Sequence, residues 1–149
     1  MKSLIYIFSF FFLFPSIETE TMSKIEWQTD YESVLEQAKK DKKNVLVFFT
    51  GSDWCPPCIQ LKKDLFETEE FKEVSSEYVL LYVDFPRNKD LLTPEQYAQN
   101  KSLITKYNKK GVFPLMTVLS SNGVILDDYS GYSMNGVVQY HLEFLKKNK

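Results

Sequence analysis

The sequence predicts an α/β protein in which helices flank a central mixed sheet. The apolar run over residues 45–49 is continuous, as expected for a strand that is buried on both faces, and residues 78–85 predict a second buried strand. Segments with helical spacing alternate with these runs along the chain, which is typical of α/β architecture. The length of 149 residues suits one domain, and the hydrophobic content of 44% is sufficient for its core.

The first residues differ from the rest of the chain. Lys2 precedes an apolar run over residues 4–14, and a polar stretch follows. A charged start, a short apolar block and a polar exit are typical of a secretory signal, and the run is about half of the ~20 residues that a transmembrane helix needs. We therefore predict a signal peptide over residues 1–21, with an uncleaved anchor as the alternative, and one globular domain over residues 22–149.

Capping side chains mark the helix starts in the first half of the domain. Asp30 can cap a helix that runs to about residue 40, and Thr68 can cap a shorter one that runs to about residue 77. In both segments apolar residues recur at helical spacing and define a buried face. The expected elements of this half are a short strand near residues 25–27, helices over 30–40, 57–65 and 68–77, and strands over 45–49 and 78–85.

The second half carries stronger local signals. Thr93, Pro94 and Gln96 supply an N-cap, a proline at the first helical position and a capping-box partner. Ser-Asn-Gly at residues 121–123 predicts a hairpin turn. The expected elements are therefore a helix over 93–108, strands over 115–119 and 124–126, and an amphipathic helix over 135–147 whose inward residues are Val138, Leu142 and Leu145.

The chain has two cysteines, Cys55 and Cys58, at the junction of a predicted buried strand and the next helix. The carboxyl ends of strands are the usual place for chemistry in open α/β sheets. A thiolate at a helix start is favoured by the dipole and by free N–H groups, and it can attack a disulfide to form a mixed disulfide that a second thiol resolves. We expect Cys55 to be the exposed nucleophile and Cys58 the shielded resolving thiol, with Trp54 covering one side of the site.

Other interpretations of the pair have weaker support. A zinc site needs about four ligands, and the single histidine, His141, lies far along the chain. We interpret His141 as an ordinary surface residue and expect no metal and no cofactor beyond the redox-active disulfide Cys55–Cys58. A purely structural disulfide here would close too small a loop to constrain the unfolded chain much. Loss of activity in an otherwise intact site is the remaining alternative.

These residues resemble the thioredoxin superfamily. The resemblance is carried by Val-Leu-Val-Phe-Phe over residues 45–49, which leads into Trp-Cys-Pro-Pro-Cys over 54–58, and by Phe113-Pro114 before the strand over 115–119. It covers about residues 25–147 and is strongest with exported bacterial thioredoxin-like proteins, which are similar to periplasmic disulfide reductases. The same central motif occurs in tryparedoxins and nucleoredoxins, but their flanking segments match less well. The resemblance implies a thioredoxin fold.

The resemblance also implies the residues around the cysteines that receive a substrate. Pro114 would be the cis-proline that faces the disulfide. Three positions depart from the family pattern: Phe49 replaces the usual buried aspartate, Ile59 stands where a basic residue often follows the second cysteine, and Phe113 is bulky for the position before the proline. Proton transfer at Cys58 must then use water or another acid. The implied supporting residues are Trp54, Pro56, Pro57, Phe113 and Pro114.

The sequence therefore predicts a thiol–disulfide oxidoreductase that acts on protein disulfides in the periplasm or as a secreted protein. Pro56 and Pro57 lack backbone N–H groups, so a thiolate at Cys55 has few donors. We therefore expect a reductant or exchanger with a potential of roughly −200 to −270 mV. The alternatives are a thioredoxin-fold module that holds partners non-covalently and an oxidant that donates disulfides.

The expected partners follow from this prediction. They are protein disulfide substrates and an upstream thiol electron donor, which the sequence does not identify. A formal net charge of −2 gives no indication of nucleic-acid binding. We expect a monomer that contacts a membrane only if the N-terminal segment stays uncleaved.

Overall fold

A mixed sheet of five strands runs through the centre of the computed structural model, in the order β1-β3-β2-β4-β5. The structure describes residues 25–149, so the predicted signal peptide over residues 1–21 lies outside the described residues. The strands are β1 (Trp27–Gln28), β2 (Asn44–Thr50), β3 (Tyr78–Asp84), β4 (Leu115–Leu119) and β5 (Ile125–Ser130). The helices are α1 (Tyr31–Asp41), α2 (Pro56–Leu61), the π-helix η1 (Lys62–Phe66), α3 (Glu69–Ser75), the 3-10 helix η2 (Lys89–Leu91), α4 (Pro94–Tyr107) and α5 (Gln139–Lys147).

The central strand β2 pairs with β3 in parallel and with β4 antiparallel. Residues 45–50 of β2 are all buried, as the apolar run predicts. β2 and β3 end side by side, with Thr50 opposite Asp84. The segments that leave these two strands therefore start at the same edge of the sheet, and one of them leads to the cysteines.

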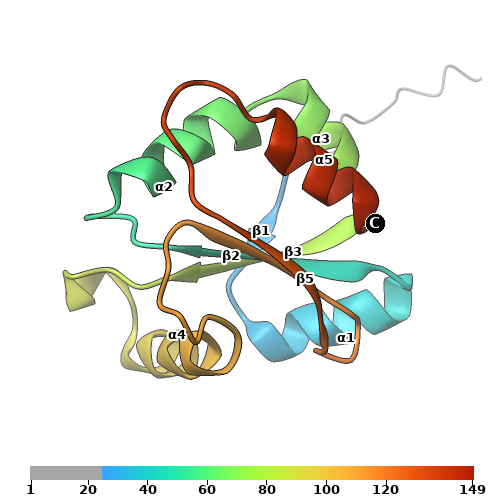
Figure 1. Ribbon diagram of the computed structural model, residues 1–149. Helices are drawn as coiled ribbons and strands as arrows, with labels where there is room; N and C mark the ends of the chain where they lie inside the picture. The colour runs from blue at the N-terminus through green and yellow to red at the C-terminus, as the bar shows by residue number, and fades with distance from the viewer. Residues whose placement is uncertain (1–24) are drawn as a thin grey trace, which may run out of the picture.

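Helices cover both faces of the sheet and divide the core in two (Figure 1). On one face α2, α3 and α5 bury an aromatic-rich cluster in which Phe48 and Phe66 make an edge-to-face contact. On the other face α1 and α4 pack against the alternate side chains of β2, such as Val47 and Phe49. No helix within residues 25–149 combines the length and apolar character needed to cross a bilayer.

The predicted caps are confirmed. The side chains of Asp30 and Thr68 accept hydrogen bonds from the backbone N–H groups of Ser33 and Phe71, and Thr93 forms the expected capping box with Gln96. Each bond satisfies a helix N–H group that would otherwise have no partner.

Several predicted bounds are wrong. The first strand lies at Trp27–Gln28 rather than 25–27, and the helix after Cys58 becomes a π-helix from Lys62 onward. β5 extends to Ser130, well past the predicted end at residue 126, because its pairing with β4 continues through Asp127 and Asp128. An edge strand tolerates such charges, which also discourage pairing with other chains.

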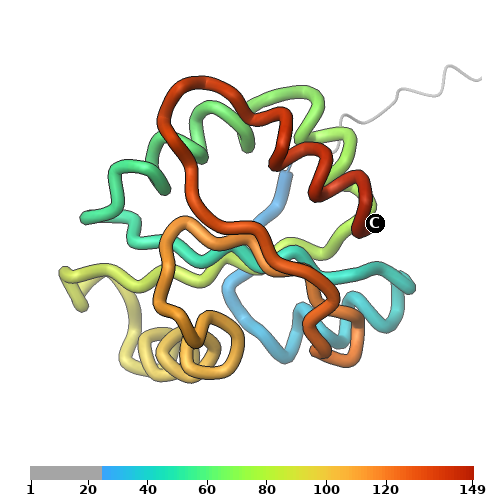
Figure 2. The backbone as a smooth tube through the Cα atoms, viewed as in Figure 1, coloured from blue at the N-terminus to red at the C-terminus, as the bar shows by residue number. Residues whose placement is uncertain are grey.

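The last helix begins at Gln139 and not at residue 135. Side chains compete for the backbone just before it: the Val137 N–H bonds to the Asn135 carboxamide, and the Gly136 N–H bonds to the Tyr132 hydroxyl. The segment over residues 131–138 is therefore a loop, which rises from β5 past α2 before α5 begins (Figure 2).

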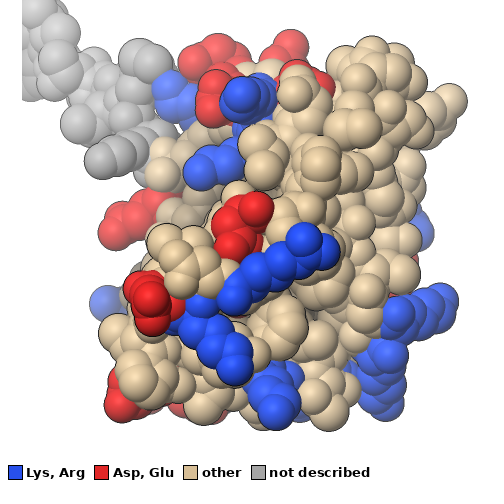
Figure 3. Space-filling view, turned by 90° about the vertical axis from the view of Figure 1, so that its left-hand side faces the viewer, with Lys and Arg blue, Asp and Glu red and all other residues tan. Residues whose placement is uncertain are grey.

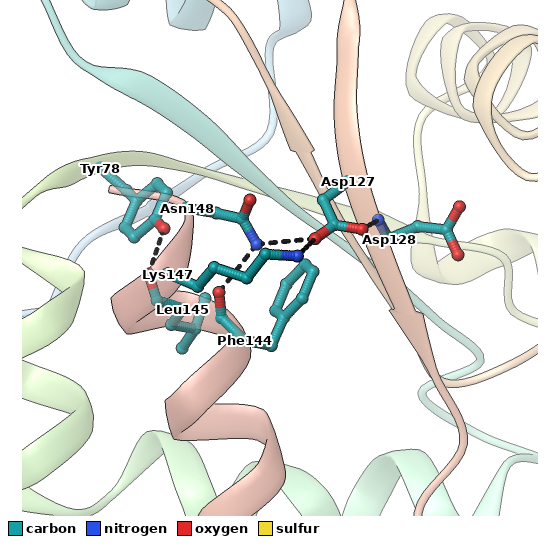
Figure 4. Close-up of polar contacts among 7 residues, drawn as sticks. All are labelled: Tyr78, Asp127, Asp128, Phe144, Leu145, Lys147 and Asn148. Carbon is teal, nitrogen blue, oxygen red and sulfur yellow. Dashed lines mark hydrogen bonds and ion pairs between the residues drawn. The ribbon is translucent and has the colours of Figure 1, made fainter.

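The end of α5 is fixed to β5 by polar contacts (Figure 4). Asp127 accepts hydrogen bonds from Lys147 Nζ at 2.9 Å and from Asn148 Nδ2 at 3.0 Å. These two bonds, the one from Lys147 first, lower the pKa of the Asp127 carboxyl. Asn148 also accepts a bond from Asn44 Nδ2 through its carbonyl, so the chain end is joined to two strands.

Candidate active site

Cys55 and Cys58 lie where β2 passes into α2 and are joined by a disulfide with a Cα–Cα distance of 5.3 Å. Cys55 is the N-cap of α2, and its N–H bonds to the Gly51 carbonyl at 2.9 Å. The prediction that Cys55 is exposed is wrong for this oxidised form: Cys55 is 3% exposed and Cys58 is 1% exposed. Both belong to the core cluster, against which Trp54 and Phe113 pack.

The start of α2 offers few hydrogen-bond donors. Pro56 and Pro57 occupy its first two positions and have no N–H group. The next two N–H groups, of Cys58 and Ile59, both bond to the Cys55 carbonyl, at 3.0 and 3.1 Å. Pro56 is exposed and Pro57 half-buried, so the turn between the cysteines reaches the surface even though the cysteines do not.

Phe113 and Pro114 approach the same edge of the sheet from β4. Leu115 pairs with Phe49 near the end of β2, which places Pro114 beside the segment that leads to Cys55. The Phe113–Pro114 peptide bond is cis, as the resemblance implies. Pro114 is buried, and its carbonyl accepts a hydrogen bond from the Gly131 N–H at 2.9 Å. The predicted site residues on the two segments therefore come together.

Trp54 connects these segments to the loop after β3. Its ring meets Phe113 edge-to-face, with ring centroids 5.4 Å apart. Its indole N–H donates to the Phe85 carbonyl at 2.7 Å, and the Arg87 guanidinium lies 5.3 Å from the ring centroid. Trp54 thus has a defined position beside Cys55 rather than a loose one.

The Asp53 side chain binds the backbone of the same loop. Its two carboxylate oxygens accept hydrogen bonds from the N–H groups of Arg87 at 2.9 Å and Asn88 at 2.8 Å. The Asn88 bond and then the Arg87 bond lower the pKa of the Asp53 carboxyl. The carboxylate is therefore ionised at neutral pH and serves as an anchor for the loop.

A second carboxylate lies near the end of β2, but its position differs from that of the family aspartate. Phe49, which occupies the family position, is fully buried. Asp84 is buried at the end of β3, and its oxygens accept from the Ser52 N–H at 2.9 Å and the Ser52 hydroxyl at 2.5 Å. Both oxygens of this carboxylate are therefore bonded to Ser52, the second residue after β2.

The loop over residues 131–138 ties the Pro114 region to the helix that carries Cys58. Tyr132 donates a hydrogen bond to Asp64 of η1. His141 Nε2 lies 3.1 Å from the Gly131 carbonyl, and the His141 ring packs between Tyr129 and Tyr132. The interpretation of His141 as a surface residue is wrong, since it is 4% exposed. Burial lowers its pKa.

Sequence reasoning missed the residues that hold the site from outside the motif. Asp53 and Arg87 are 34 positions apart, and Asp64 and Tyr132 are 68 apart, so no local pattern links either pair. One signal was available: Arg87 is the only arginine in a chain whose other strongly basic residues are lysines.

The fold and the disulfide at the start of α2 define a protein of the thioredoxin superfamily. The chain belongs to the thioredoxin-like family, which it matches over residues 26–120. It is similar to disulfide bond reductase DsbH of Chlamydia pneumoniae, with 33% identity over 102 residues that make up 68% of this chain and 60% of DsbH. It is also similar to thioredoxin-related protein DsbJ of the same organism, with 32% identity over 69% of this chain and 29% of DsbJ.

A solved structure described as DsbH oxidoreductase has a similar fold, with a TM-score of 0.73 and 28% identity, over 85% of this chain and 88% of that one. The chain thus spans less than two thirds of the length of the two curated relatives, whereas it matches most of the solved structure.

Proposed function

We propose that the protein is a thiol–disulfide oxidoreductase that reduces or exchanges disulfides of other proteins. The observation that carries this proposal is the Cys55–Cys58 disulfide at the β2–α2 junction, with Trp54 and the Phe113–Pro114 segment gathered beside it. The similarity to DsbH, a disulfide bond reductase and oxidoreductase, supports the same activity.

In the proposed reaction Cys55 is the nucleophile and Cys58 the resolving thiol. The Cys55 thiolate attacks one sulfur of the substrate disulfide, whose S–S bond breaks, and the leaving thiolate takes a proton from solvent. The Cys58 thiolate then attacks the Cys55 sulfur, releases the second substrate thiol and forms the Cys55–Cys58 disulfide. Two electrons pass to the substrate, and an upstream thiol donor must return them for another cycle.

The roles of the two cysteines follow from their places on α2. Cys55 precedes the helix and adjoins the exposed Pro56, whereas Cys58 lies within the helix. A substrate disulfide therefore has a shorter path to Cys55. Trp54 and Phe113, both half-buried, would form the apolar walls of that approach.

Two measurements test the activity and the roles. Reduction of insulin by dithiothreitol should be accelerated by the wild-type protein and not by Cys55→Ser. Cys58→Ser should trap mixed disulfides with partner proteins, whereas Cys55→Ser should trap far fewer. Equal trapping by both variants would contradict the assignment of roles. Partner capture that survives in both variants without any disulfide would instead favour the non-covalent binding module.

We also propose that the protein works outside the cytoplasm, either in the periplasm or as a secreted protein. The support is the charged, apolar and polar succession within residues 1–21. Mass spectrometry of the protein from its native source tests this. A first residue between positions 17 and 22 would support export, and an intact Met1 in a soluble cytosolic fraction would contradict it.

A further inference from the structure

Arg87 is held beside the candidate active site by bonds that do not use its own charge. Its backbone N–H and that of Asn88 bond to Asp53, and the preceding Phe85 carbonyl accepts from Trp54. The Phe85 N–H bonds to the Thr50 carbonyl at 2.9 Å, and its ring stacks on Tyr97 with centroids 5.4 Å apart. The loop that carries Arg87 is thus fixed on both sides.

The guanidinium of Arg87 has no ion-pair partner within residues 25–149, where the ion pairs are Lys72–Glu69 and Lys147–Asp127. It makes no side-chain hydrogen bond to the described residues and is exposed. The Asp53 carboxylate accepts hydrogen bonds from the backbone N–H groups of Arg87 and Asn88, and the charge of Arg87 adds only the smallest of the effects that lower its pKa. Its carbon Cζ lies over the Trp54 ring, 5.3 Å from the centroid, so its N–H groups are available to a ligand.

An arginine in this position differs chemically from a lysine. A planar guanidinium can lie on an indole while its edge N–H groups bind a carboxylate through two parallel hydrogen bonds. The chain has 17 lysines, yet its single arginine is the residue placed on Trp54. On the face that includes the start of α2, basic side chains extend across the middle and lower right, and acidic side chains lie among them in the centre and at the left (Figure 3).

We infer that Arg87 is a specificity-determining residue that binds a carboxylate on the substrate next to the disulfide that Cys55 attacks. The preferred substrates are therefore protein segments with an aspartate or glutamate close to the reactive cysteine. This inference rests on the proposed disulfide reduction. Because the loop is fixed, the Arg87 cation is in place before the substrate arrives. Binding therefore loses little conformational entropy at Arg87.

The test uses two synthetic peptides, each with one intramolecular disulfide, that differ only by glutamate or glutamine beside the first cysteine. Pre-reduced protein reacts with each peptide in single turnovers at low salt, and mass spectrometry after alkylation gives the second-order rate constants. The quantity compared is the ratio of the rate for the glutamate peptide to that for the glutamine peptide. This ratio cancels any general loss of activity in a variant.

The ratio should be about two- to ten-fold higher for wild type than for Arg87→Gln, since an exposed charge contact contributes modestly. Arg87→Lys should give an intermediate ratio, because it keeps the charge without the paired hydrogen bonds. Lys89→Gln, two residues further on at the start of η2 and over Tyr97, is the matched control and should keep the wild-type ratio. Added salt should reduce the wild-type ratio.

Equal ratios for wild type and Arg87→Gln, with both peptides reduced, would overturn the role of Arg87 and leave the proposed function standing. A fall in the ratio as large for Lys89→Gln as for Arg87→Gln would also overturn it, because the preference would then come from net charge alone. If wild type reduces neither peptide, the proposed function itself fails, and this inference fails with it.

Discussion

The indole of Trp54 lies directly against Gly51. A methyl group added at Gly51 would stand 2.2 Å from the indole Cε2, which is far inside contact distance. Only glycine at this position lets the ring lie where it bonds to Phe85 and meets Phe113. The residue three positions before Trp54 therefore sets the place of the side chain that borders Cys55.

We predict that Gly51→Ala displaces Trp54, slows disulfide reduction and lowers the free energy of unfolding by about 1–3 kcal/mol, the usual cost of overpacking. Urea unfolding and insulin reduction measure the two effects. In a Trp54→Ala background the same change should cost much less, because the clash is gone. An equal cost in both backgrounds would show that the ring is not the cause.

A second prediction concerns the bond between Tyr132 and Asp64. Tyr132→Phe removes the donor to Asp64 and the acceptor for the Gly136 N–H, so it should lower the free energy of unfolding by about 1–2 kcal/mol. Desolvation and the Asp64 bond raise the pKa of Tyr132, so the hydroxyl remains a donor at neutral pH. In an Asp64→Ala background Tyr132→Phe should cost clearly less, and additive costs would argue against the bond.

The third prediction is a pH dependence from His141. Because burial lowers its pKa below the ordinary value of 6.5, the unfolded chain binds the proton more readily than the folded one. The contribution of neutral His141 to the free energy of unfolding should therefore be fully present above pH 6.5. It should decline as the pH falls through 6.5 toward the lower pKa of the folded state. Urea midpoints of a tag-free protein between pH 7.5 and pH 5 measure this decline.

The control for the third prediction is His141→Gln, which keeps a donor for the Gly131 carbonyl but does not titrate. Since the chain has one histidine, this variant should show a much flatter profile over the same range. The groups that pack on His141 are the rings of Tyr129 and Tyr132. An unchanged slope in the variant would assign the pH dependence to other groups.

The fourth prediction concerns the two prolines. An N-cap side chain accepts from the N–H at the second or third helical position, and here the second position is Pro57. Pro57→Ala restores that donor to a Cys55 thiolate and should raise the reduction potential by about 10–30 mV. Pro56→Ala, one position earlier, should change it less.

Equilibration with glutathione measures these potentials. The wild-type value should lie at roughly −200 to −270 mV. A value of about −120 mV would reverse the proposed direction and make the protein a disulfide donor. Equal shifts in the two alanine variants would point to chain stiffness rather than to the restored donor.

The sequence predicted most of the fold because its signals are local. The apolar run of β2, the caps at Asp30 and Thr68 and the capping box at Thr93 each act within a few residues. The start of α5 was missed because the side chains of Asn135 and Tyr132 bind the backbone that would otherwise be helical. These bonds span only four and two residues, but the spacing of apolar residues does not record side-chain bonds to the backbone.

The sequence predicted the residues of the cysteine motif but not the residues that surround them in the structure. Cys55, Cys58, Trp54 and Pro114 belong to recognisable short motifs. The prediction for His141 was wrong because a lone histidine on a helix usually lies at the surface. Here the loop over residues 131–138 and β5 cover it. Arg87 was not singled out, because its importance comes from a ring 33 positions earlier in the chain.

The bonds that fix Asn148 to Asp127 and Asn44 have a practical consequence. They hold the chain end on the side of the molecule opposite the turn that precedes α2 (Figure 1). A fluorophore, a surface linker or a second protein attached after Lys149 would therefore point away from the cysteines. A Cys58→Ser chain immobilised through this end should leave Cys55 unobstructed for large folded substrates, and the trapped partners should be eluted with a reductant alone.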